Sequence, residues 1–524
     1  MKKLLTVVIL TGSLALTART ETDAPRLDLR CVAPPSPGLP LSSAAPASPR
    51  RPKKRLGRSV LEFFGVMAFS QTNYWVRYSD WIEDWQFELT WEDQSKRFFS
   101  LDALRFDSNC FRLNWTHALS GAMYYNIARS NHLNQWESFI FGVLTSMYWE
   151  YIVEWREVIS VNDNLLNIFG GFPIGETWFQ IGRALHHSPK PLHRVLSFIN
   201  PIFKFNAWLD RKRNDPAPPP PGWQRFGLSI GARNAPSGES RNWGGFAELN
   251  MKIVTVPEYG TDRNVNRAVG HTLFSELRIG AAMGRAGTGE IDAYARSVYL
   301  GHFWQKRKAG QAGWAWMLGL GSAFTLTKKE GVAFYDSCGV EYNDGQDLHL
   351  EEPRNFRDKY TIVHVAGPVL DATLFAGPLR ARLTLDATLD FAMMNALALG
   401  AYSAIHDISG VKTTLLYYGY YYGFGASASA AFTLDYRNLF LEVRASLHHA
   451  SSIEGLDRVQ DTLTDDFHLR DRRWRTTMRL GVALPGTPAR IFVSQDLRGG
   501  AGWIGEIDRR ERETRWMVGL DLQF

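Results

Sequence analysis

LRARLTLDATLDF, residues 379–391, alternates apolar and polar side chains along its whole length. Leucine, alanine and Phe391 occupy every second position, and charged residues such as Arg380, Arg382 and Asp386 lie between them. Successive side chains of an extended strand point to opposite faces, so this period of two predicts a β-strand with one apolar and one charged face. The segment is long enough to cross the hydrocarbon layer of a bilayer as a tilted strand.

Similar runs recur between residues 224 and 524, and about twelve can be counted between turn-rich segments such as 234–242 and 284–290. An even number of long antiparallel strands is typical of a single-chain outer-membrane barrel. A secreted β-sandwich also alternates, but its strands usually have about five or six residues. A charge that faces lipid at the bilayer midplane costs about 2–4 kcal/mol, so we expect the charged faces to line a lumen and the apolar faces to contact lipid.

Two further runs, LFLEVRASLH (439–448) and RRWRTTMRLGVAL (472–484), place charged residues on one face and apolar residues on the other. Aromatic residues gather near a strand end in LLYYGYYYGFG (415–425), the position expected of the aromatic girdles of membrane barrels. The charges predicted to face the lumen are Arg380, Arg382, Asp386, Asp390, Glu442, Arg444, Arg473, Arg475, Arg479 and Asp521.

The chain ends on RWMVGLDLQF (515–524), in which Trp516, Leu520, Leu522 and Phe524 fall on one side of a strand. This ending resembles the C-terminal signal of outer-membrane barrels, a family that closes with an alternating strand and a terminal aromatic residue. The resemblance implies recognition by the barrel-assembly machinery and a location in the outer membrane. It implies nothing about catalysis.

The N-terminal residues predict export. MKK (1–3) is a short positive region and LLTVVILTGSLALTA (4–18) is an apolar core, so residues 1–18 are predicted to be a secretory signal peptide. Residues 19–57 are rich in proline and contain the basic run RRPKKR (50–55), which predicts a disordered tether. The net charge of +6 over 524 residues is modest, so no nucleic-acid partner is expected.

From residue 58 to residue 210 the apolar period lengthens toward 3.6, which predicts a separate all-α domain. A proline-rich linker, residues 211–222, then leads to the barrel, residues 223–524. The expected fold is therefore α+β, with an N-terminal helical domain followed by a transmembrane antiparallel β-barrel of about twelve strands. Helices are predicted at 58–69, 114–130, 134–159, 162–169, 174–187 and 191–209.

Polar residues of this domain fall in helical register. His117 lies in one predicted helix, Glu150 and Glu154 are one turn apart in another, and Asp163 begins the next. Carboxylates at i and i+4 that face a histidine on a neighbouring helix form the metal sites of helix bundles, and crowded carboxylates raise one another's pKa toward a catalytic range. We therefore treat His117, Glu150, Glu154 and Asp163 as candidate catalytic residues, and the first three as candidate ligands of a divalent metal ion.

The same residues also fit a structural polar network. Ser160 and Asp163, three positions apart, have the pattern of a capping box that begins a helix. The two glutamates could instead anchor Arg129 or Arg156. The sequence alone leaves both interpretations open.

A wider pattern of residues runs through this region: Asn and His near a Gly and paired Tyr, then Ala-Arg-Ser, Trp-Glu-Tyr with a second Glu, Ser-x-Asn-Asp, and Gly-Gly before Gly-Glu. Its members are Asn114, His117, Gly121, Tyr124, Tyr125, Ala128, Arg129, Ser130, Trp149, Glu150, Tyr151, Glu154, Ser160, Asn162, Asp163, Gly170, Gly171, Gly175 and Glu176. With this pattern the chain resembles the DUF-3943 family, a bacterial domain of unknown function found in front of predicted outer-membrane barrels. The resemblance implies the identity of the domain and assigns it no activity.

Three functions remain open at this point. The first is a gated conduit or envelope-organising protein, whose helical domain faces the periplasm or docks in a lumen that arginines make attractive to anions. The second is an outer-membrane enzyme that acts on lipid or lipopolysaccharide through the His/carboxylate site. The third is a structural anchor that binds a periplasmic protein. Outer-membrane lipid, lipopolysaccharide and the barrel-assembly machinery are the expected partners in all three cases.

Overall fold

The computed structural model describes residues 52–78, 85–212, 222–237, 240–284, 289–308, 312–329, 358–457, 460 and 462–524. The predicted signal peptide, residues 1–18, lies outside the described residues. The predicted tether up to residue 51 and residues 213–221 of the predicted linker lie outside them as well.

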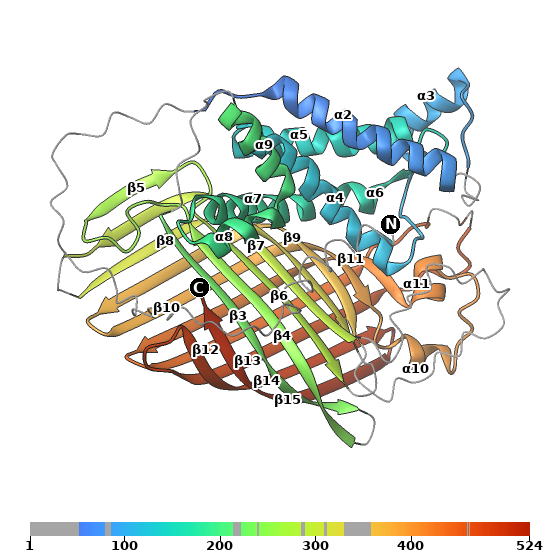
Figure 1. Cartoon of the computed structure of the whole chain (residues 1–524). Coiled ribbons are helices and arrows are strands. Elements are labelled where there is room, and N and C mark those ends of the chain that lie inside the picture. Colours follow the sequence, from blue (N-terminus) through green and yellow to red (C-terminus); the bar gives the residue numbers. More distant parts are fainter. Residues whose placement is uncertain are drawn as a thin grey trace, which may run out of the picture. The chain divides into compact units, whose positions relative to one another are not determined.

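Twelve antiparallel strands close into a barrel, which confirms the predicted fold class and strand number (Figure 1). The last strand, β15, pairs with the first, β3, and this pairing closes the ring. A short extra strand, β5 (Val265–Val269), pairs with the second half of β7 beyond the end of β6. The ring consists of β3 Trp223–Ser237, β4 Ser240–Val254, β6 Phe274–Gly284, β7 Gly289–Lys306, β8 Gly313–Lys329, β9 Lys359–Ala376, β10 Leu379–Asn395, β11 Tyr420–Tyr436, β12 Leu439–Ser452, β13 Leu469–Ala483, β14 Ala489–Ile504 and β15 Ile507–Gln523.

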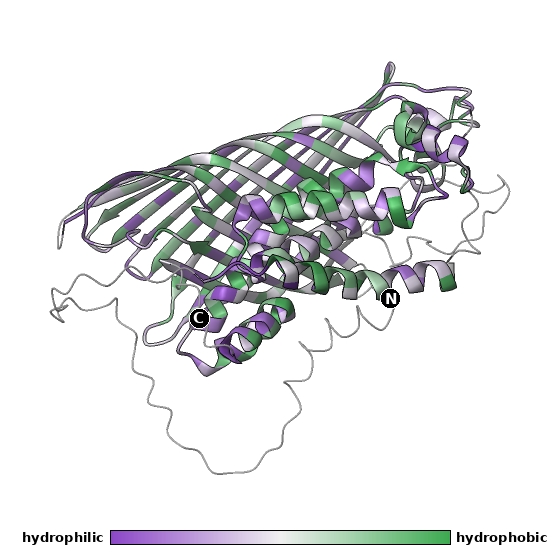
Figure 2. Cartoon of the chain, turned by 90° about the horizontal axis from the view of Figure 1, so that it is seen from above, coloured by the Kyte–Doolittle hydropathy of each residue, from purple (hydrophilic) through white to green (hydrophobic). Residues whose placement is uncertain are grey.

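Side chains of the wall alternate between the two faces, as the period of two predicts (Figure 2). On β10, Leu383, Leu385 and Leu389 are exposed on the outer face, whereas Arg382 and Asp390 are buried on the inner face. The wall therefore has an apolar outside and a charged inside.

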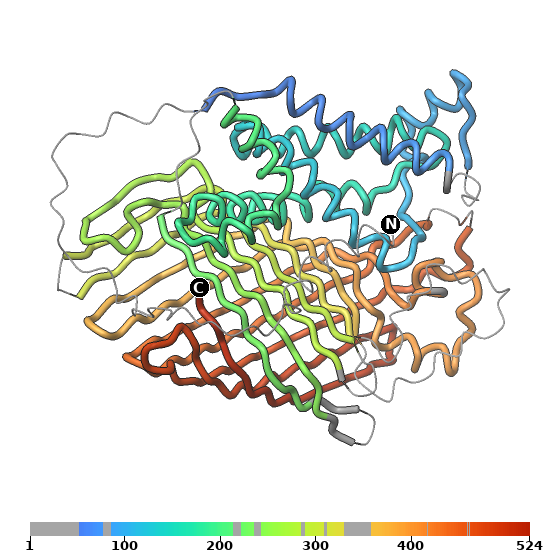
Figure 3. Tube along the Cα trace, viewed as in Figure 1, coloured from blue at the N-terminus to red at the C-terminus, as the bar shows by residue number. Residues whose placement is uncertain are grey.

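Helices occupy the chain between residues 56 and 212, in agreement with the predicted all-α domain (Figure 3). Two short parallel strands, β1 (Leu104–Arg105) and β2 (Ile159–Ser160), join segments within this domain. The helices are α2 Leu56–Asn73, α3 Trp91–Phe99, α4 Phe111–Ser130, α5 Gln135–Tyr148, α6 Val161–Leu165, α7 Gly171–His187, α8 Pro191–Leu196 and α9 Pro201–Lys212.

The single helix predicted over residues 134–159 is wrong beyond Tyr148. There α5 passes into one π-helical turn, Trp149–Val153, and the chain then leaves the helix. The reason is the guanidinium of Arg97, which donates to the backbone carbonyls of Tyr151 (2.9 Å), Glu154 (3.0 Å) and Glu157 (2.7 Å). Those carbonyls would otherwise accept the hydrogen bonds of a continuing helix. Arg97 belongs to α3, a helix that the sequence pattern did not predict.

The helices form a layer on the outer face of the barrel wall. At one end of this layer, Leu185 of α7 packs with Phe226 of β3 and Met251 of β4. Arg225 and Lys252, their neighbours in the strands, line the interior cavity. Because neighbouring residues of a strand point to opposite faces, Phe226 and Met251 point outward.

At the other end of the layer, Phe111 of α4 and Leu166 pack with Phe391 of β10 and Tyr422 of β11, which also point outward. The expectation that the helical domain faces the periplasm from the barrel mouth or docks in the lumen is therefore corrected. The outer wall offers an apolar strip against which apolar helix faces can be buried. The interior offers charged side chains instead.

The aromatic stretch 415–425 also departs from the expectation of an interfacial girdle. Residues Thr413–Tyr418 form a short helix, α11, and Gly419 (φ 67°) reverses the chain into β11. The hydroxyl of Tyr420 donates to the carbonyl of Asn109 (2.5 Å) and that of Tyr422 donates to the carbonyl of Asp107 (2.7 Å). These tyrosines hold the helical layer against the wall.

Within the described ranges, no helix combines the length and the apolar character needed to cross a membrane.

Helices α4 and α7 cross with almost no space between their backbones. A Cβ atom at Gly121 would lie 1.8 Å from the carbonyl oxygen of Asn167, and one at Gly171 would lie 2.6 Å from the backbone of Gly121. Only glycine permits this approach.

We predict that Gly121→Ala destabilises the helical layer by about 1–3 kcal/mol or more, because backbone atoms must move apart. The matched control is Gly65→Ala on α2, where an added Cβ meets nothing within 4 Å. There alanine should stabilise the helix by about 0.5–1 kcal/mol. Hydrogen exchange of the helical amides in detergent-purified protein measures both effects, and equal protection in the two variants would contradict the close crossing.

Candidate functional site

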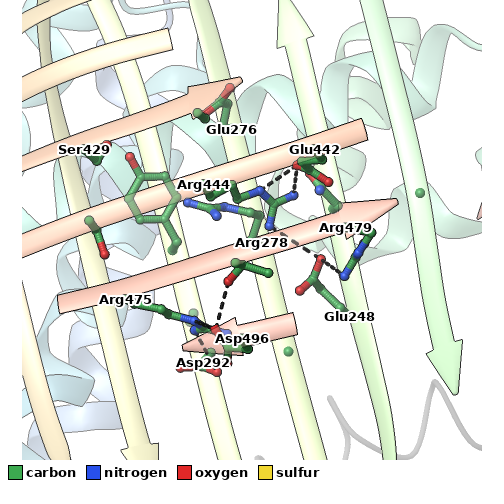
Figure 4. Close-up of a pocket in the computed structure, with 18 of the residues that line it drawn as sticks. Glu248, Glu276, Arg278, Asp292, Ser429, Glu442, Arg444, Arg475, Arg479 and Asp496 are labelled. Atoms are coloured by element: carbon green, nitrogen blue, oxygen red, sulfur yellow. Dashed lines mark hydrogen bonds and ion pairs between the residues drawn. The ribbon is translucent and has the colours of Figure 1, made fainter. Parts of the chain in front are cut away.

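The interior of the barrel contains a cavity of about 260 Å³ (Figure 4). Among the described residues, its lining includes eleven arginine or lysine side chains and nine carboxylates. An interior this rich in charge is a candidate site for a polar or ionic solute.

The structure places all ten charges that were predicted to face the lumen on the inner side of the wall. Most of them line the cavity. Asp390 bonds to a residue of the cavity lining, and Arg380 donates to the hydroxyl of Tyr259 in the interior. Arg473 lines a smaller pocket. Those lining the main cavity are Arg382, Asp386, Glu442, Arg444, Arg475, Arg479 and Asp521.

Ion pairs join opposite walls across the interior. Arg475 of β13 lies 3.2 Å from Asp292 of β7, a strand six positions away in the ring of twelve. Glu290, also on β7, accepts from Arg515 of β15 at 2.6 Å and from Arg498 of β14 at 2.6 Å. This group of side chains, the central cluster, crosses the lumen.

A second group links the other side of the interior. Asp371 of β9 accepts from Arg382 at 2.8 Å and from Lys252 of β4 at 2.8 Å. Lys252 also pairs with Glu276 of β6. A cation shared between two carboxylates on distant strands holds the walls at a fixed separation.

A third group leaves positive charge without a carboxylate partner. Glu248 lies 3.4 Å from Arg479 and 3.7 Å from Arg444. Arg278 lies beside Arg444 in Figure 4, with its guanidinium 4.3 Å from the ring of Tyr294. Among the described residues, neither Arg278 nor the cavity-lining Arg225 forms an ion pair. The excess of cations over carboxylates in the lining therefore faces the cavity itself.

Apolar clusters lie at both ends of the interior. At the end where β3 begins, Val256 and Tyr259 from the segment after β4 pack with the inward-facing Met317 and Val369. At the opposite end, Ala398, Leu399, Val411 and Leu415 from the segment between β10 and β11 pack with the inward-facing Tyr421, Leu469 and Ile504. In the structure the cavity thus lies between two apolar plugs.

The inner wall also carries a chain of hydrogen-bonded groups on neighbouring strands. His364 contacts Asp390 at 2.9 Å, Asp390 accepts from Ser427, and Ser427 lies 2.7 Å from Nδ1 of His448. A catalytic triad requires the carboxylate on the far nitrogen of the histidine that contacts the serine. Here Asp390 contacts His364, whereas Ser427 contacts His448, so these groups form a polar network and not a triad. Sequence spacing gave no signal for it, because its members come from separate strands.

The four candidate residues of the helical domain do not converge on one point. His117 lies 3.5 Å from Asp163, and these two residues form one pair. Glu150 accepts from the backbone N–H of Ser160 at 3.0 Å, and Glu154 accepts from the indole of Trp149 at 2.8 Å. Among the described residues, no group of three His, Cys, Asp or Glu side chains is arranged to hold a metal ion. The geometry supports the structural-network interpretation for Glu150 and Glu154.

A more closely connected carboxylate in this domain is Glu176 of α7, which sequence reasoning did not select as a site residue. It accepts from Arg129 at 2.7 and 3.1 Å and from the hydroxyl of Tyr125 at 2.6 Å. From the barrel side, Thr272 donates to it at 2.6 Å. The Gly-Glu pair that ends the family pattern was the available signal for it.

Comparison with known proteins identifies the domain and leaves its activity open. Residues 103–202 match the family model described as Domain of unknown function (DUF3943). No curated protein matches the chain.

Solved structures similar to this chain include a porin, an autotransporter β domain and an outer membrane protein, all at low identity. The anion-selective porin from Comamonas acidovorans has 8% identity and a TM-score of 0.19, covering 58% of this chain and 100% of its own. The β domain of the Bordetella autotransporter Brka has 10% identity and a TM-score of 0.19, covering 57% and 99%. The outer membrane protein opdK from Pseudomonas aeruginosa has 11% identity and a TM-score of 0.17, covering 58% and 100%. At these TM-scores the likeness carries no functional argument.

We predict that Glu176→Gln loosens the helical layer from the barrel. Removing one partner of a buried ion pair costs about 3–5 kcal/mol, because Arg129 would keep its charge without a counter-charge. The control is Glu92→Gln on the exposed surface of α3, where little change is expected. Protease sensitivity of residues 56–212 at increasing urea concentration, with the barrel still folded, measures the difference. Identical sensitivity of the two variants would contradict the role of Glu176.

The plug between β10 and β11 is held by a hydrogen bond to a titratable carboxyl group. Asp457, in the segment after β12, accepts from the backbone N–H of Thr414 at 2.8 Å. Burial raises the pKa of Asp457 from 3.8 to about 6. A raised folded-state pKa means that the stabilisation is present below about pH 4 and is lost as the pH rises through about 6.

We therefore predict that the amide of Thr414 is better protected from hydrogen exchange at pH 5 than at pH 7.5, after correction for the intrinsic rate. The difference should approach about 3 kcal/mol over the full titration, at about 1.4 kcal/mol per pKa unit. Asp457→Asn should abolish it, whereas Asp407→Asn, at an exposed position nearby, should preserve it. A pH dependence that survives Asp457→Asn would show that another group causes it.

Proposed function

We propose that this protein is an integral outer-membrane barrel that acts as a gated conduit with a preference for small anions, and that the structure is its closed state. The observation that carries the proposal is the cavity between two apolar plugs, whose lining has more cations than carboxylates among the described residues. A structural anchor would not require an internal cavity with an excess of positive charge.

Membrane insertion is supported by the sorting of side chains between the two faces of the wall. Leu389, Leu480 and Val493 expose 71%, 60% and 51% of their surface on the outside. In water such an apolar surface would favour association or aggregation, and in a bilayer it contacts acyl chains.

Gating is supported by the kind of interaction that closes the lumen. The central cluster consists of ion pairs between strands that are not neighbours, so it can break without breaking a hydrogen bond of the sheet. Breaking it exposes charged groups that water can solvate once the plugs move. The anion preference follows from Arg225 and Arg278, which form no ion pair among the described residues.

The enzyme hypothesis ranks lower on the same geometry. Glu150 and Glu154 bond to their own domain, and the serine on the inner wall lacks the order of a triad. Binding of a periplasmic protein through the tether remains a proposal without a contact to support it.

The terminal strand fits the proposed route of assembly. Trp516 and Leu520 remain exposed on the outer face, whereas Phe524 stacks on Phe226 of β3 and contacts the ring of His193 of α8 edge-on. The helical layer covers the terminal aromatic residue, so we propose that the assembly machinery reads it before the layer docks.

Planar-bilayer recording of the purified full-length protein tests the conduit. The wild type should be closed most of the time, with brief anion-selective openings. Glu290→Gln with Asp292→Asn should raise the open probability about tenfold or more, since each loss of about 1.4 kcal/mol from the closed state is a factor of ten. Asp508→Asn, in an exposed ion pair of a hairpin, is the control and should leave gating unchanged.

Selectivity is tested in the same recordings by Arg278→Gln, which should lower the permeability ratio of chloride to potassium. Arg510→Gln, an exposed arginine outside the cavity, serves as its control. Absence of any conductance from the wild type and from the cluster variant, both folded, would rule out the conduit.

A further inference from the structure

The outermost helices of the helical layer expose apolar side chains on the side that faces away from the barrel, and their buried side holds polar as well as apolar groups. On α5, Trp136, Ile140 and Leu144 are exposed, whereas Thr145 and Ser146 are buried. A helix on the surface of a water-soluble domain has the opposite arrangement. Here the charged and hydroxyl groups are turned inward.

Helix α2 repeats this inverted pattern. Leu61 and Phe69 expose 75% and 69% of their surface, and no charged residue between 56 and 73 is exposed. Its two charged residues, Arg58 and Glu62, point inward. Arg58 bonds to Asp210 of α9 at 2.8 Å.

The same holds for α9, where exposed Phe205 and Trp208 alternate with buried Asn206 and Asp210. Asp210 is shared between Arg58 and the ring of His132, which lies 2.6 Å away. Burial of paired polar groups under an apolar outer surface is the arrangement that a low-dielectric exterior requires.

The position of the layer on the wall points to the nature of that exterior. The strip of barrel wall that the helices cover follows one row of paired residues across the strands. In this row Met251 pairs with Leu277, and Phe324 pairs with Val363. On β10 the row reaches Phe391, which is 1% exposed. The row therefore crosses the barrel from the end where β3 begins toward the opposite end.

Exposed apolar wall borders this strip on both sides. Leu389, two residues from the covered Phe391 toward the end where β3 begins, is 71% exposed. Ile279, two residues from the packed Leu277 toward the opposite end, is 42% exposed. If acyl chains cover the bare wall on both flanks, they also surround the helices that lie between the flanks.

Cations gather where the helices end. Lys54 precedes α2, and Arg211 and Lys212 end α9, and all three are exposed. The Arg58–Asp210 pair brings these two ends together. Lysine and arginine at the end of an apolar surface are suited to the phosphates of lipid headgroups. Helix α2 has 18 residues, or about 27 Å at 1.5 Å per residue, close to the thickness of a hydrocarbon core.

We propose that the helical layer lies within the outer membrane beside the barrel, with the outer faces of α2, α5 and α9 in contact with lipid acyl chains and the cations at their ends in contact with lipid phosphates. No helix has to span the membrane alone, because each has protein on its inner side. This inference rests on the proposed membrane location of the barrel and is independent of whether the barrel conducts.

Spin labels test this placement in proteoliposomes of the full-length protein. A nitroxide is attached through a genetically encoded keto side chain at position 61 or 144, so that the native cysteines stay in place. Two reference positions are labelled in the same way: 389 on the bare barrel wall and 92 on the exposed polar surface of α3. Collision rates with oxygen, which enters lipid, and with a water-soluble nickel chelate are compared.

The ratio of oxygen to nickel accessibility at positions 61 and 144 should match that at position 389 and exceed that at position 92. Nickel accessibility equal to that at position 92 would place the helices in water and overturn the inference. Labels shielded from both reagents would show a protein partner on this face, which would also overturn it. A water-like ratio at position 389 would instead refute the membrane location of the barrel.

Discussion

The structure depends on a sorting of side chains that the period of the β-strand imposes. Every second residue of the wall points inward, and there the charges of β7, β13, β14 and β15 meet as ion pairs such as Arg475–Asp292 and Arg515–Glu290. The pairing of β15 with β3 closes the ring, so backbone groups along this seam bond within the sheet while the charges pair with one another. The apolar exterior and the narrow interior both follow from this arrangement.

The interior and the exterior then impose different demands on the rest of the chain. Two apolar plugs lie between the charged cavity and the barrel ends. Outside, the helical layer presents apolar groups toward the wall and away from it, and buries polar groups such as Asn206 and Asp210 in its own interior. Glu176, Tyr420 and Tyr422 are among the polar contacts that fix the layer on the wall.

Prediction from sequence succeeded where a local period carried the information. The alternation of 379–391 and its repeats gave the strands, their number and the inward face of residues such as Arg382 and Glu442. It failed where a distant group intervened: Arg97 takes the carbonyls that would have continued α5, and the tyrosines of β11 bond to the segment before α4. The candidate site of the helical domain was derived from spacing along one helix, and spacing does not report what lies across from Glu150 or Glu154.

By itself the sequence determined that the chain forms a long-stranded antiparallel barrel with a charged inside, preceded by helices, because periods of 2 and 3.6 are properties of neighbouring residues. Only the tertiary structure decided which charges pair across the lumen, that both ends are plugged, and that the helices lie on the outer wall. Those outcomes depend on contacts between residues hundreds of positions apart, such as Arg498 with Asp292, and on the shape that the closed ring gives to the space around them. No local pattern encodes that shape.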